Sequence, residues 1–101
     1  MWAAGILHGA DGGLDGISNL VPKHCVNLYN AIVSNDPKVY DLQREINEIF
    51  RVYECRSFLG GIKMAMHLMG LCEPLTSHPI TGVNEQEIAK IKMVLENNNL
   101  L

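Results

Sequence analysis

The residues with the greatest capacity for chemistry lie near the start of the chain, in a stretch rich in aspartate and glycine. Residues 9–19 read GADGGLDGISN. A calcium-binding loop that began at Asp11 would need a bidentate glutamate at its twelfth position, where this sequence has Pro22. Neither the G-x-G-x-x-G pattern of a dinucleotide site nor the G-K-[ST] pattern of a P-loop occurs. The stretch therefore predicts a tight turn that leads into a strand.

The histidines and cysteines do not have the spacing of a metal site. Zinc sites combine close pairs such as C-x₂-C and H-x₃-H, whereas here His24 and Cys25 are adjacent and the other members are scattered: His8, His67, His78, Cys55 and Cys72. We therefore expect no metal and no cofactor. Three cysteines without a close pair also argue against a disulfide framework and favour a reducing, cytoplasmic location.

No lysine has the surroundings of a nucleophile. A lysine that forms a Schiff base needs a desolvated position that lowers its pKa. The lysines fall on predicted helices, mostly on polar faces: Lys23, Lys38, Lys63, Lys90 and Lys92. We expect no catalytic residue within this chain.

Length and charge narrow the classes of protein further. The 101 residues are enough for one domain but too few for a complete (β/α)₈ barrel, which needs about 250. The net charge is −3, with eight lysines and arginines spread singly, which argues against nucleic-acid and anionic-membrane surfaces. The apolar start is short, lacks basic residues and runs into acidic sequence, so we expect neither a signal peptide nor a membrane span.

Apolar side chains recur with a helical period from residue 20 onward. This spacing predicts helices over residues 20–33, 37–53, 58–69 and 84–97, after a short helical end over 2–7, with an extended connector over 71–83. Local signals mark the ends: Asp36 before Pro37, Ser57 as an N-cap, Gly70 as a left-handed stop, and Asn84 with Glu87 as a capping box. Gly60 and Gly61, near the start of a helix, predict close contact with a neighbouring element.

The predicted strand over residues 13–18 has no partner within this chain. A buried lone strand cannot satisfy its own backbone donors and acceptors. Either it pairs with polypeptide outside the chain, or it is not a strand here.

The order of these features resembles the C-terminal third of the dihydrodipicolinate synthase and N-acetylneuraminate lyase family. The features are the Gly9 to Gly12 turn, a strand that ends at Ser18 and Asn19, the helix start at Asp36, the glycine pair at 60 and 61, and the connector between Pro74 and Pro79. The resemblance covers essentially the whole chain.

The resemblance implies a mostly α fold class. It would be a C-terminal fragment of a TIM (β/α)₈ barrel, with its last strand and helix, plus an appended three-helix C-terminal domain. Residues 1–35 would be the end of the barrel and residues 36–101 the helical domain. The family's members are pyruvate-dependent class I aldolases and lyases, so a 2-oxo acid is the implied substrate and a homo-oligomer the implied assembly. The family's Schiff-base lysine lies on an earlier strand and maps to no residue here.

The end of the predicted strand holds the candidate substrate-binding residues Asp15, Ser18 and Asn19, because active sites of such barrels gather at strand ends. Strand alternation sends Asp15 and Leu14 to opposite faces. Since burying an unpaired carboxylate costs several kcal/mol, we expect Asp15 to face the barrel interior and Leu14 to face the helices. Local roles are the alternatives: Asp15 and Ser18 bonded to nearby backbone, and Asn19 capping the next helix.

A second hypothesis is a non-enzymatic helical module that oligomerises. A strand and helix without their barrel would leave apolar surface for another chain to cover. Under this hypothesis the chain functions without further polypeptide, whereas a barrel fragment does not.

Overall fold

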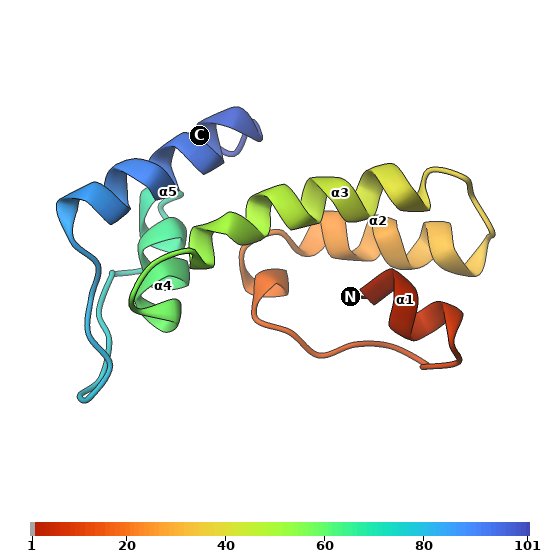
Figure 1. Ribbon diagram of the computed structural model, residues 1–101, viewed down its shortest axis with the longest axis horizontal. Helices are drawn as coiled ribbons and strands as arrows, with labels where there is room; N and C mark the ends of the chain where they lie inside the picture. Colours follow the sequence, from red (N-terminus) through yellow and green to blue (C-terminus); the bar gives the residue numbers. More distant parts are fainter. Residues whose placement is uncertain (1) are drawn as a thin grey trace. The chain divides into compact units, whose positions relative to one another are not determined.

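The computed structural model describes residues 2–101, so Met1, the first residue of the expected 1–35 region, lies outside the described part (Figure 1). Every regular element in residues 2–101 is helical. The chain divides into two compact units, residues 1–47 and residues 48–101. None of the helices described is long and apolar enough to cross a membrane.

The first unit is built on α1 (Trp2–Leu7), the 3₁₀ helix η1 (Ile17–Asn19) and α2 (Pro22–Val33). Both α1 and η1 contact α2. The helix expected from Leu20 begins at Pro22, because the residue before a proline is pushed out of the helical region and Val21 has φ −132°. The core of this unit comes from one face of α2, from the residues just before it and from two residues of the next helix: Ile17, Leu20, Val21, Cys25, Leu28, Ala31, Ile32, Val39 and Ile46.

The helix expected over residues 37–53 is shorter and changes type at its end. α3 runs over Val39–Ile49 and passes into the 3₁₀ helix η2 (Phe50–Tyr53). Asp36 still marks the start, since its Oδ1 accepts a hydrogen bond of 2.9 Å from the Lys38 amide.

The second unit packs α4 (Phe58–Leu68) against α5 (Glu85–Asn97), with η2 against both. Its core is apolar: Ile49, Val52, Tyr53, Ile62, Ala65, Ile91 and Leu95. The expected caps are confirmed. Ser57 Oγ accepts from the Gly60 amide, Gly70 has φ 75°, and Asn84 with Glu87 forms the full capping box.

The close approach expected at the two adjacent glycines is also confirmed. A Cβ atom on Gly60 would lie 2.7 Å from the carbonyl oxygen of Thr81, and one on Gly61 would lie 2.5 Å from Cys55 Sγ. Only glycine lets α4 approach the connector and the turn before it this closely.

The strand expected over residues 13–18 is wrong for this structure. Residues 11–16 form a loop, and Ile17 to Asn19 turn into η1; Figure 1 draws this part as a long loop without a neighbouring strand. The physical reason is the one that made the strand doubtful, because no segment within residues 2–101 lies alongside it to complete a ladder.

Candidate functional site

Asp15, Ser18 and Asn19 come together in one tight turn that joins the loop to α2. Asp15 Oδ1 accepts a hydrogen bond of 2.8 Å from the Ser18 amide, and Ser18 Oγ donates to the Asp15 carbonyl at 3.0 Å. Asn19 Nδ2 donates to the Gly16 carbonyl at 3.1 Å. Asn19 does not cap α2, whose N-cap residue is Val21. The turn is therefore held by its own side chains.

Leu14 does not face the helices, contrary to the expectation. Gly13 lies against α1, since a Cβ on Gly13 would be 2.7 Å from Trp2 Nε1. Ile17 is buried, and Asp15 lies close enough to Cys25 of α2 to influence its thiol. Leu14, by contrast, is fully exposed. The odd-numbered residues thus face the helices, and the side chain of Leu14 points away from them.

The burial of Cys25 beside this turn raises the pKa of its thiol. Desolvation raises the pKa of the Cys25 thiol, and the Asp15 carboxylate raises it further. A thiol in these surroundings stays protonated and unreactive at neutral pH. Cys25 is therefore a packing residue on the buried face of α2.

A hollow of about 290 Å³ lies between α1 and residues 12–15. Trp2, Ile6, Leu14, Asp15 and three glycines line it, and no lysine or histidine does. Within residues 2–101 there is no group of three metal-binding side chains. The lining of this hollow is thus largely apolar, with the Asp15 residue as its one acidic member.

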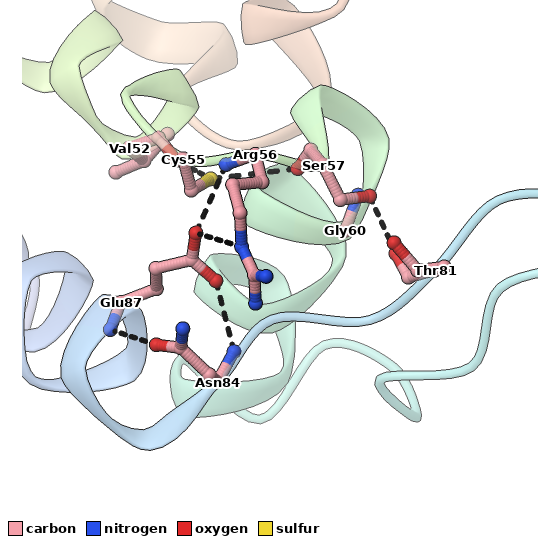
Figure 2. A network of polar contacts seen from close by, with 8 residues as sticks. All are labelled: Val52, Cys55, Arg56, Ser57, Gly60, Thr81, Asn84 and Glu87. Carbon is pink, nitrogen blue, oxygen red and sulfur yellow. Dashed lines mark hydrogen bonds and ion pairs between the residues drawn. The ribbon is translucent and has the colours of Figure 1, made fainter.

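A second polar network lies in the unit of residues 48–101 and is centred on Glu87 (Figure 2). Its Oε1 accepts from the Arg56 amide at 2.9 Å and from Arg56 Nε at 3.4 Å, and its Oε2 accepts from the Asn84 amide at 2.9 Å. The backbone hydrogen bonds from Arg56 and Asn84 hold the pKa of Glu87 below its ordinary value. Nearby, Ser57 Oγ donates to the Thr81 carbonyl. The network fastens the start of α5 and the connector to the turn before α4.

The sequence predicted one part of this network but not the other. The spacing of Asn84 and Glu87 predicted their mutual capping, but nothing in the sequence predicted that Arg56, 31 residues earlier, would share the same carboxylate. Glu87 is almost buried, which indicates that its carboxylate has a second partner. This burial is known only from the structure.

Comparison with known proteins gives a family match over nearly the whole chain. Residues 1–98 match the Dihydrodipicolinate synthetase family. N-acetylneuraminate lyase 2 of Escherichia coli is 26% identical over 98 residues, 95% of this chain and 32% of that protein. The 4-hydroxy-tetrahydrodipicolinate synthase of Jannaschia sp. is 28% identical over 95 residues, 93% of this chain and 33% of that protein. The chain thus spans about a third of the length of these curated relatives.

Solved structures agree with the match. The dihydrodipicolinate synthase of Bacteroides thetaiotaomicron is 32% identical, with a TM-score of 0.87 over 95% of this chain and 34% of that one. The Thermotoga maritima synthase gives a TM-score of 0.90 at 24% identity, over 98% of this chain and 34% of that one. The helical fold described above is therefore that of one third of a synthase chain.

Proposed function

The chain belongs to the dihydrodipicolinate synthetase family, and from this premise we propose that residues 1–101 form the C-terminal part of a pyruvate-dependent, Schiff-base-forming lyase or aldolase. The observation that carries the proposal is the family match over residues 1–98 to about a third of each relative. Within this proposal, α1 is the end of a barrel helix, residues 13–18 take the place of the last barrel strand, and α2 is the last barrel helix. Residues 1–35 close the barrel, and residues 36–101 are the appended helical domain.

The chemistry needs a lysine from polypeptide outside these residues. Its amine attacks the ketone of a 2-oxo acid and forms an imine with loss of water. Loss of a proton from the adjacent carbon gives an enamine, which forms a carbon–carbon bond to an aldehyde; the reverse sequence breaks that bond. Residues 1–101 would contribute the end of the last strand, where the turn built by Asp15, Ser18 and Asn19 is the proposed substrate-binding segment. The complete enzyme would be a homo-oligomer in the cytoplasm.

Borohydride trapping tests this proposal directly. Purified residues 1–101 are incubated with pyruvate and sodium borohydride, and the intact mass is measured. We expect no covalent adduct on the chain alone, and one reduced pyruvate adduct when the same residues are part of a polypeptide that includes the preceding two thirds of the family fold. An adduct on residues 1–101 alone would refute the assignment of the lysine to other polypeptide.

The second candidate, a helical module that self-associates, is favoured by the exposure of Leu14 and by further apolar side chains on α2. Val26 and Val33 are both more than half exposed. Finding an in-frame barrel sequence with a lysine, in the DNA upstream of the codon for residue 1, would support the enzyme. The lack of such a sequence would support the module.

A further inference from the structure

We propose that Asp15 is a positioning residue, which holds the turn of residues 16–19 in place and does not itself touch substrate. The part of this inference that concerns substrate depends on the proposed function. The part that concerns the turn depends only on the geometry of residues 1–47.

One carboxylate oxygen of Asp15 is committed to the turn. Oδ1 accepts the hydrogen bond from the Ser18 amide at 2.8 Å, and η1 has no side-chain cap from its own N-cap residue, Gly16. Asp15 therefore provides, from one position earlier, the acceptor that a helix start requires. A small apolar residue at this position could not do so.

The other carboxylate oxygen is closed to a ligand. Oδ2 exposes less than 1 Å² and has no hydrogen-bond partner among residues 2–101. The side chain lies on the face that packs toward α2, where its charge acts on the buried Cys25 thiol. Asp15 contributes to the lining of the hollow beside α1, as Leu14 does, but this oxygen is not accessible from it.

The turn presents other groups to the outside. The Ser18 hydroxyl proton points to the Asp15 carbonyl, so the oxygen of Ser18 keeps an acceptor site. The amide nitrogen of Asn19 is bonded to Gly16, while the residue itself is exposed. By holding Ser18 in place, Asp15 determines the positions of the Ser18 and Asn19 side chains.

Amide hydrogen exchange in the 101-residue chain tests the turn, with Asp15→Ala and Asp15→Asn as the variants. Asp15→Ala removes the acceptor, and we expect the Ser18 amide to exchange roughly fivefold faster, as loss of a cap of about 1 kcal/mol implies. Asp15→Asn keeps an oxygen at the same place, so most of the protection should return. Asp11→Asn makes the same charge change on an exposed side chain and should leave Ser18 unchanged.

The Leu28 and Ile32 amides of α2 report whether each variant is folded. If Asp15→Ala unfolds α2, the unmodified chain still tests the proposal. The protection factor of an amide compares its exchange rate in the chain with its rate in an unstructured peptide. The Ser18 amide must have a higher protection factor than the Leu14 amide. Equal protection factors, or a Ser18 amide that Asp15→Ala leaves unchanged in a folded chain, would overturn the proposal.

A second measurement separates positioning from contact in the polypeptide that includes the preceding two thirds of the family fold. Positioning predicts that Asp15→Ala raises KM severalfold and that Asp15→Asn restores it, with the pH profile of kcat/KM unchanged. A KM that rises equally in both variants would indicate direct contact of the carboxylate with substrate and contradict the proposal. Failure to trap a pyruvate adduct in that polypeptide would remove the proposed function and leave the exchange result standing.

Discussion

At the scale of single residues, the packing depends on glycine positions as much as on positions with a side chain. Gly61 lies where α4 meets the turn after η2, and its lack of a Cβ leaves room for the Cys55 thiol and the Val52 carbonyl. Cys55 Sγ lies 3.5 Å from the Val52 carbonyl oxygen and 3.4 Å from the Ser57 carbonyl oxygen, so its one proton is shared between two acceptors. A methyl group at residue 61 would clash with the Val52 carbonyl and the Cys55 thiol.

We expect Gly61→Ala to lower the free energy of unfolding by about 2 kcal/mol, because overpacking of a tight contact outweighs the gain in helix propensity. Urea denaturation followed by circular dichroism measures the change. The matched control is Gly5→Ala in α1, where a Cβ meets nothing within 4 Å, so stability should stay the same or rise. A Gly61→Ala chain as stable as the unmodified one would show that the contact is loose.

At the scale of elements, one carboxylate joins three segments. Glu87 caps its own helix through Asn84 and also accepts two hydrogen bonds from Arg56, ahead of α4. A charged carboxylate is the better acceptor for all of these donors. The attachment of α5 to the rest of its unit should therefore depend on the ionisation of Glu87.

The sign of this dependence follows from the direction of the pKa shift. The pKa of Glu87 in the folded chain is lower than its ordinary value of 4.5, so the folded state favours the charged form. Its contribution to stability is complete above pH 4.5 and disappears as the pH falls through the lowered, folded-state pKa. Since the hydrogen bonds of Glu87 serve as a cap, the first amides to lose protection should be those of the first turn of α5.

We expect Glu87→Gln to lower the unfolding temperature at pH 7 and to make little difference at a pH below the folded-state pKa, where the unmodified side chain is also neutral. Thermal unfolding of both chains across this range measures the difference. Glu85→Gln, in the same first turn and exposed, is the control and should have a smaller effect. A difference that persists unchanged at low pH would mean that the charge of Glu87 is not what matters.

The elements also show how far sequence reasoning reaches. Helical periodicity and local capping residues predicted α4 and α5 nearly to the residue, because those signals act over one or two turns. The end of α3 was less accurate, since its change to η2 depends on packing against α4 and α5. The facing of Leu14 was wrong because it was derived from the alternation of a strand, whereas these residues form a loop that ends in the turn held by Asp15 and the Ser18 amide.

At the scale of the whole molecule, the unit of residues 1–47 leaves apolar side chains in water. Leu14 is 102% exposed, and Val26, Val33 and Tyr40 are each more than half exposed. The family match spans about a third of each relative, so other polypeptide is available in those proteins to cover such a surface. Residues 1–101 by themselves have no such cover.

We therefore expect the isolated chain to self-associate at high concentration and to bind an apolar fluorescent dye. Sedimentation velocity across a concentration series measures the association, and Leu14→Asn should weaken both signals. Asn27→Asp, an exposed polar change on α2, is the control. A chain that remains a monomer and does not bind the dye would show that these exposed side chains do not drive self-association.

The open loop of residues 11–16 also has a consequence for how the chain is degraded. A protease binds its substrate as an extended segment with free backbone groups, and within residues 2–101 no amide of residues 12–15 donates a hydrogen bond to the chain. The connector around Leu75 is exposed too, but it is tied by the Thr76 and Ser57 hydroxyl bonds to the Ile80 and Thr81 carbonyls. Brief digestion with chymotrypsin should therefore cut first after Leu14 and release α1 with its loop, and mass spectrometry would show whether a cut after Leu75 comes earlier instead.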